Sequence, residues 1–176
     1  MKIRRVATGH NASGRSIVAS DVQIDAIGVK LLPGCEFHNL WGSDEKPQIA
    51  IDGAPPSAPG YFPSPEGLRF LMFTIPPKSE QTRTSIDYPS AIAEANEKLP
   101  GFLERMERNA PGMHTTDTID FDYVIEGEVT LELDDGKEVL LRAGDTVVQN
   151  GTRHRWRNES SRPVRVLACL IGARRA

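Results

Sequence analysis

The chain has 176 residues, a formal net charge of −3, a pI of about 5.8 and 39% hydrophobic residues. This length suits one domain with a core of its own. The slightly acidic charge and the scattered basic residues argue against nucleic acid as a partner. The sequence has no apolar run of about 18 residues and no signal-peptide pattern at Met1, so we expect a cytoplasmic protein without a membrane partner.

Short strands are predicted for the N-terminal part of the chain. Residues 4–10 and 16–22 contain β-branched residues and are joined by the turn-like stretch NASGR, which predicts a hairpin. The stretches 26–34 and 68–77 also have the composition of strands, and residues 35–42 resemble a strand that leads into a turn.

A proline-rich segment lies between two of these strands, over residues 46–67. It contains Pro47, Pro55, Pro56, Pro59, Pro63 and Pro65. Because proline lacks the backbone N–H that helices and central strands need, this segment is neither. Its length indicates an arm, a lid or a disordered loop rather than an ordinary connection.

One helix is predicted after this region. Ser90 is a suitable N-cap, the side chains of Ile92, Ala95 and Leu99 share one face, and Pro100-Gly101 ends the pattern. Residues 102–108 predict a second short helix.

From Met113 onward the sequence predicts strands and turns. Two alternating runs flank Asp135-Gly136, a strong signal for a hairpin, and residues 163–172 form a last strand.

Two groups of spaced residues in this part resemble the motifs of the cupin superfamily. In the first, His114 takes the place of the first histidine of the family motif, Thr116 that of the second, Asp120 that of the glutamate, and Gly127 follows seven residues later. The second opens with Gly144 and continues to His154 and Asn158, with a spacing one residue shorter than usual and without the proline that the family has near Asn150.

The resemblance implies a fold and an assembly, but it does not select one function. It implies an all-β, double-stranded β-helix (jelly-roll) barrel over residues 110–172. Residues 1–109 would form an N-terminal β extension with the proline-rich arm and one or two short helices, within one structural domain. The resemblance also implies a homodimer. Cupins include oxygenases, decarboxylases, isomerases, lyases, storage proteins and sugar-binding regulators, so the fold leaves the activity open.

The candidate ligands are two imidazoles and one carboxylate. Residues two apart in a strand share a face, so Asp120, Asp122 and Val124 should face inward, as should His154 and Trp156 on a later strand. Together, His114, Asp120 and His154 would form a two-histidine, one-carboxylate site for a divalent metal ion, Fe, Mn, Ni or Zn. The alternative is that both histidines are core residues and that Asp120 caps a turn.

Three further residues complete the predicted site. Thr116 is a poor metal ligand, but its hydroxyl could hydrogen-bond a metal-bound water, and with Trp156 it would line the substrate cavity. Asp122 is the candidate catalytic residue, because a second inward carboxylate beside Asp120 would have a raised pKa and could act as a general base. The alternative for Asp122 is an exposed position near the rim.

Three functions remain open from the sequence. The first is a metal-dependent enzyme that acts on a small organic molecule, with the proline-rich arm over the barrel mouth. The second is a metal-free cupin that binds a small ligand without turnover, which the missing second histidine favours. The third is a structural, dimeric module.

Overall fold

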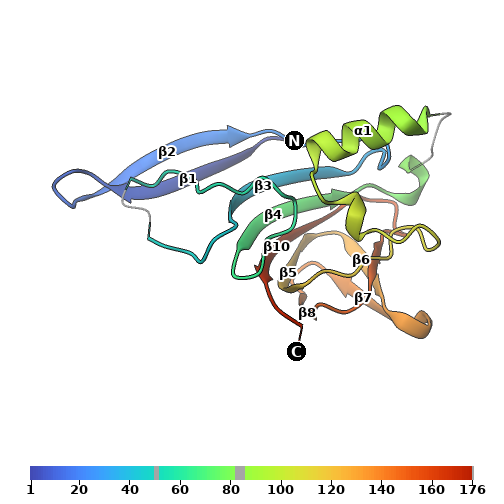
Figure 1. Ribbon diagram of the computed structural model, residues 1–176. Helices are drawn as coiled ribbons and strands as arrows, with labels where there is room; N and C mark the ends of the chain where they lie inside the picture. The colour runs from blue at the N-terminus through green and yellow to red at the C-terminus, as the bar shows by residue number, and fades with distance from the viewer. Residues whose placement is uncertain (50–51, 82–85, 176) are drawn as a thin grey trace.

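Two antiparallel sheets form the barrel in the computed structural model, which describes residues 1–49, 52–81 and 86–175 (Figure 1). The larger sheet has the order β3 (Glu36–Ser43), β4 (Leu68–Ile75), β10 (Val164–Gly172), β5 (Thr118–Glu126) and β8 (Thr146–Asn150). The smaller sheet has the order β7 (Glu138–Arg142), β6 (Glu128–Glu132) and β9 (Arg155–Arg157). The predicted all-β barrel is therefore confirmed.

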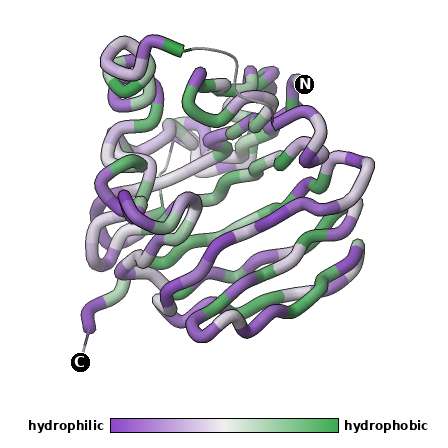
Figure 2. The backbone as a smooth tube through the Cα atoms, turned by 90° about the vertical axis from the view of Figure 1, so that its right-hand side faces the viewer, coloured by the Kyte–Doolittle hydropathy of each residue, from purple (hydrophilic) through white to green (hydrophobic). Residues whose placement is uncertain are grey.

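Strand β5 places the central polar residues of the barrel. Its side chains alternate between buried and exposed along its whole length, so the predicted inward face with Asp120, Asp122 and Val124 is confirmed. Phe121 and Tyr123 lie on the outer face. Figure 2 shows hydrophobic and hydrophilic residues interspersed along the strands of the barrel. A strand with this alternation has one face in the cavity and one outside it.

The N-terminal hairpin is confirmed as β1 (Ile3–His10) and β2 (Ser16–Ile24), which form a separate sheet. It projects away from the barrel on the left of Figure 1. Arg5 fixes its base, because its guanidinium lies 5.3 Å from the centre of the Trp41 ring and donates a hydrogen bond of 3.2 Å to the carbonyl of Leu40. The hairpin between β6 and β7 is also confirmed, with the short 3-10 turn Asp134–Gly136 at its tip.

The strand predicted over residues 26–34 is wrong. This stretch makes one isolated bridge between Ile27 and Phe37 and then turns, with the N–H of Leu32 bonded to the carbonyl of Val29. The N–H of Cys35 bonds in turn to the carbonyl of Leu32. Two successive turns use the backbone groups that a strand would need for pairing.

The helix α1 spans Tyr88–Lys98 and has Asp87, not Ser90, as its N-cap residue. Proline is favoured in the first turn of a helix, and Pro89 there moves the start upstream. The buried face holds Ala91 and Ala95, whereas Ile92 is 44% exposed. The second predicted helix is reduced to a 3-10 turn over Leu103–Arg105. Another short 3-10 turn, Lys78–Glu80, follows β4.

The proline-rich segment is a packed arm. Over its described residues, 46–49 and 52–67, it contains neither helix nor strand, as predicted; residues 50 and 51 lie outside the described residues. Tyr61 is buried, and its ring makes edge-on contacts with Phe37 at 5.7 Å and Phe102 at 5.0 Å. The arm therefore contributes to the core beside the larger sheet.

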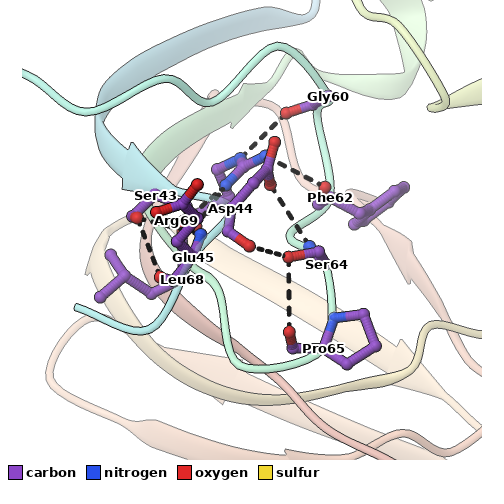
Figure 3. A network of polar contacts seen from close by, with 9 residues as sticks. All are labelled: Ser43, Asp44, Glu45, Gly60, Phe62, Ser64, Pro65, Leu68 and Arg69. Carbon is purple, nitrogen blue, oxygen red and sulfur yellow. Dashed lines mark hydrogen bonds and ion pairs between the residues drawn. The ribbon is translucent and has the colours of Figure 1, made fainter.

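Arg69 on β4 fastens this arm to the sheet (Figure 3). Its Nε donates to the carbonyl of Gly60 at 2.9 Å and its Nη2 to that of Phe62 at 3.3 Å. Nη1 donates to the carbonyls of Ser43 and Leu68, and Nη2 also contacts the Asp44 carboxylate at 2.5 Å. The five N–H donors of a guanidinium thus all have acceptors, which allows this charged side chain to be buried.

Two apolar clusters fill the interior. One contains six residues from the barrel strands: Val124, Val129, Leu131, Leu141, Val164 and Val166. The other joins the sheet to the arm and α1 and includes Phe37, Tyr61, Leu71, Leu99 and Phe102. Strands β3 and β4 belong to the same sheet as β10 and β5, so the sheet crosses the predicted boundary between residues 109 and 110. No helix in the described part of the chain is long and apolar enough to cross a membrane.

Candidate active-site cavity

A cavity of about 760 Å³ opens between the two sheets, the arm and α1. Aliphatic side chains and a group of aromatic ones form its apolar walls; the aromatic ones include Phe37, Tyr61, Phe62, Phe73, Phe102 and Trp156. Its polar interior groups include two pairs, the imidazoles of His114 and His154 and the carboxyls of Asp120 and Asp122. Cavities that bind small molecules commonly combine apolar walls with a few polar groups in this way.

The two imidazoles lie side by side. Their ring centres are 4.1 Å apart, and the backbones of His114 and His154 bond to each other through both N–H groups, at 2.9 and 3.0 Å. This isolated bridge links the segment before β5 to the segment before β9. The edge of the Trp156 ring meets His154, with 5.9 Å between the ring centres.

Hydrogen bonds fix the tautomer of both rings. His114 Nδ1 lies 3.0 Å from the carbonyl of Gly112, and His154 Nδ1 lies 2.9 Å from the carbonyl of Thr152. A carbonyl only accepts, so Nδ1 carries the hydrogen and the neutral ring has its lone pair on Nε2. Burial lowers the pKa of His154 to about 4, with a further contribution from His114, and burial also lowers the pKa of His114. Both rings are therefore neutral at pH 7, with Nε2 able to accept a proton or a metal ion.

The two carboxyls form the second polar pair. Burial raises the pKa of Asp120 to about 6, with a smaller effect of the neighbouring Thr118 side chain in the opposite direction. Burial, and then the charge of Asp120, raise the pKa of Asp122 to about 8. At pH 7 Asp122 therefore holds its proton while Asp120 is mostly ionised. The alternative of an exposed Asp122 at the rim is wrong, because its side chain is buried.

The predicted three-ligand metal set is not assembled. Across the described residues, no group of three or more His, Cys, Asp or Glu side chains lies close enough together to hold a metal ion. Among the resolved electrostatic effects, His114 acts on His154 and Asp120 acts on Asp122, while the carboxylate that acts on His114 is Glu107 and not Asp120. Two imidazole donors fit a metal, but the carboxylate that should complete the set does not join them.

The two residues predicted to line the substrate cavity have different outcomes. Trp156 lines it, between His154 and Phe73. Thr116 does not: it is buried at a separate hollow of about 450 Å³, where its hydroxyl accepts a hydrogen bond of 2.7 Å from Thr118. Thr116 is buried like Thr118 and Asp120, so the alternation extends to it, but it lies beyond the start of β5, away from the residues that line the cavity.

Tyr61 is a site residue that the sequence did not indicate. It lines the cavity, and burial together with the charges of Asp120 and Asp122 raises the pKa of its hydroxyl. Cys35 lines the same region as a free thiol, and burial raises its pKa to about 11, so it stays protonated. Neither residue follows a motif, because both come from irregular segments whose position depends on tertiary packing.

Ion pairs surround the side of the cavity near the histidines. Arg155 bonds Glu132 through two hydrogen bonds of 2.9 and 2.8 Å, and Arg157 lies 3.1 Å from the same carboxylate. Arg153 is paired with Glu107 at 2.6 Å. These guanidiniums thus neutralise carboxylates and hold the wall of the cavity.

Similarity to known proteins agrees with this architecture. The cupin domain family profile matches residues 104–170. Phomopsin biosynthesis cluster protein C' of Diaporthe leptostromiformis is 50% identical over 163 residues, which cover 89% of this chain and 70% of that protein. The cupin-domain-containing oxidoreductase srdB of Neurospora crassa is 40% identical over 172 residues, which cover 95% of this chain and 72% of that protein.

Among solved structures, a cupin 2 conserved barrel domain protein of Salinispora arenicola aligns with a TM-score of 0.43 and 15% identity, covering 83% of this chain and 82% of that one. The family assignment rests on the two relatives described above. Each is well over 30% identical to this chain, and the match covers more than two thirds of the relative's length. With its barrel and its spaced motif residues, the chain belongs to the cupin superfamily.

Proposed function

We propose that the chain is an enzyme that transfers protons on a small, largely apolar organic molecule held in the barrel cavity. The observation that carries this proposal is the pair of buried carboxyls, Asp120 and Asp122, on the inner face of β5 in a cavity with aromatic walls. Such a pair offers a proton donor and a proton acceptor at the same pH, because like charges in a buried site cannot both form easily.

The chemistry assigns the two carboxyls different roles. Asp122, protonated at pH 7, donates its proton to the substrate, and the ionised Asp120 accepts one. The aromatic and aliphatic walls orient a flat or branched apolar substrate. The names of the relatives, an oxidoreductase and a biosynthesis cluster protein, support an enzyme acting on a small biosynthetic intermediate.

A second candidate is a metal-dependent enzyme in which the two histidines hold a divalent ion. The matching tautomers favour it, because Nε2 of both His114 and His154 carries a lone pair. Fe, Mn, Ni and Zn all accept imidazole, and a bound ion would supply Lewis-acid or redox chemistry. The remaining coordination would have to come from outside the predicted set. A ligand-binding protein without turnover is the third candidate.

Proton exchange in deuterated water tests the leading proposal without knowledge of the substrate. A library of ketones, aldehydes and phenols is incubated with the protein, and deuterium uptake into C–H bonds is followed by mass spectrometry. We expect the wild type to accelerate exchange for some members and Asp122→Asn to lose about 100-fold or more of that rate, the usual contribution of a general acid or base.

The control is Asp25→Asn, the same substitution at an exposed aspartate paired with Lys2 outside the cavity. Equal rates in wild type and Asp122→Asn, or no acceleration for any library member, would contradict the proposal. Elemental analysis of the same preparations addresses the second candidate. About one metal ion per chain in the wild type, lost in His154→Ala, supports it.

A further inference from the structure

Tyr61 occupies a fixed position beside the carboxyl pair. It is 5% exposed, and its ring is enclosed by Phe37, Phe62 and Phe102, with ring centres 4.9 to 5.7 Å away. Its backbone N–H donates to the carbonyl of Pro100 at 2.8 Å. An aromatic side chain packed on several sides has little freedom to turn, so its hydroxyl has a defined direction.

Arg69 holds the backbone on both sides of this residue. It donates to the carbonyls of Gly60 and Phe62, the immediate neighbours of Tyr61 in the chain (Figure 3). The tyrosine is therefore placed by a buried guanidinium on β4 and not only by contacts of its own ring. A loop residue positioned in this way is suited to binding, because its site is pre-organised.

Strand pairing in the larger sheet places Asp120 and Asp122 next to residues of the apolar cluster that contains Tyr61. Asp122 pairs with Ala168 on β10, and Ala168 pairs with Leu71 on β4. Tyr61 belongs to the same apolar cluster as Leu71 and Ala168. The charges of Asp120 and Asp122 also act on its hydroxyl. Tyr61 lines the cavity, and within the described residues its hydroxyl makes no hydrogen bond.

We infer that Tyr61 is a substrate-binding residue whose hydroxyl donates a hydrogen bond to a carbonyl or phenolic oxygen of the substrate. This inference rests on the proposed function and names the substrate class: an oxygen-bearing group at the carboxyl end of the cavity, joined to an apolar body between the aromatic walls. A buried tyrosine hydroxyl is a good donor in such a site, because it desolvates more readily than a charged group.

Binding of 4-nitrophenol tests the assignment, since this probe carries a phenolic oxygen on a flat apolar ring and its absorption reports its ionisation. Phenylalanine keeps the ring packing, so Tyr61→Phe removes only the hydroxyl. We expect Tyr61→Phe to weaken binding about tenfold or more, as loss of one buried hydrogen bond to an oxygen does. The absorption of the bound probe should change as well, which a purely structural role of Tyr61 would not cause.

The matched control is Tyr123→Phe, the same substitution on the outer face of β5, where the side chain is 45% exposed. It should leave probe binding unchanged. Equal affinity of Tyr61→Phe and wild type, or a wild type that does not bind the probe at millimolar concentration, would overturn the inference.

Comparison with the deuterium exchange experiment separates the two proposals. In one outcome, Asp122→Asn loses exchange, whereas Tyr61→Phe keeps both exchange and probe binding. This outcome overturns the inference about Tyr61 and leaves the proposed function intact. In the other outcome, the wild type accelerates no exchange, but Tyr61→Phe binds the probe more weakly than the wild type does. This outcome overturns the proposed function and supports Tyr61 as a binding residue.

Discussion

The protonation of Asp122 in the cavity makes the stability of the fold depend on pH. Its pKa rises from the model-peptide value of 3.8 to about 8 in the folded protein, through burial and the charge of Asp120. The folded chain therefore binds this proton more tightly than the unfolded chain does. The stabilisation is complete below pH 3.8 and is lost as the pH rises through 8.

The histidines act in the opposite direction but over a lower range. Burial lowers the pKa of His154 from 6.5 to about 4, so protonation of this ring favours the unfolded chain as the pH falls through that interval. Above about pH 7.5 the imidazoles are almost entirely neutral in both states. Asp120, with a pKa of about 6, is by then mostly ionised. Between pH 6.5 and 8.5 Asp122 therefore loses more of its proton in the folded chain than Asp120, His114 or His154 does.

We therefore predict that the free energy of unfolding falls by up to about 2 kcal/mol between pH 6.5 and 8.5. In Asp122→Asn, which has no proton to lose, this fall should largely disappear. Denaturant titrations at several pH values measure both, with Asp25→Asn as the control that keeps the wild-type slope. A slope that is the same in wild type and Asp122→Asn would refute the role of Asp122.

At the residue scale, the sequence predicted what strand alternation determines. The positions of Asp120 and Asp122 followed from their spacing on β5, and that of Trp156 from its spacing to His154. Thr116 is buried on the same alternation, but it lies beyond the start of β5 and away from the cavity, because alternation gives the face of a residue and not how far along the chain the cavity extends. Tyr61 lies in a segment without periodicity, so its place beside the carboxyls depends on tertiary contacts that spacing does not encode.

Among the elements, the proline-rich arm depends on Arg69 for its attachment. Replacing Arg69 by lysine keeps the charge but leaves three donors in place of the five of the guanidinium. Some of the carbonyls of Ser43, Gly60, Phe62 and Leu68 would then be buried without a partner. We predict that Arg69→Lys lowers the free energy of unfolding by about 2 to 3 kcal/mol.

The matched control for this substitution is Arg174→Lys. Arg174 pairs with Glu66 at 3.5 Å on the surface, where an ion pair contributes little. Its replacement should change the free energy of unfolding by at most about 0.5 kcal/mol. Chemical denaturation measures both variants, and a loss of similar size in each would show that Arg69 is not the anchor of the arm.

Element prediction succeeded where turn chemistry marks both ends of a strand. The stretch NASGR and the pair Asp135-Gly136 located two hairpins, because their residues favour tight turns. The stretch 26–34 failed, since apolar residues in successive turns have the same composition as a strand. The start of α1 was also misplaced, because Ser90 and Asp87 are both acceptable caps and Pro89 decides between them.

At the scale of the whole molecule, the outer face of the larger sheet is unusually apolar. Phe70, Cys169, Phe121 and Val148 lie in one row across β4, β10, β5 and β8. Exposed hydrophobic side chains surround this row: Ile119, Tyr123, Ile125 and Ile171. Monomeric proteins rarely expose a contiguous apolar patch larger than about 300 to 600 Å². The exposed apolar row makes this face the candidate surface for a partner.

We propose a second copy of this chain as that partner, joined through the same face in a twofold dimer. A sheet face that is apolar at its centre can pair with the same face of a second copy around a twofold axis. Phe121→Glu places a charge at the centre of the row. Since an unpaired charge is costly to bury, we expect this variant to be a monomer in sedimentation experiments where the wild type is a dimer.

Leu140→Glu, at an exposed position on β7 in the other sheet, should remain dimeric. A monomeric wild type at tens of micromolar, or a dimer that persists in Phe121→Glu, would exclude this face as the interface.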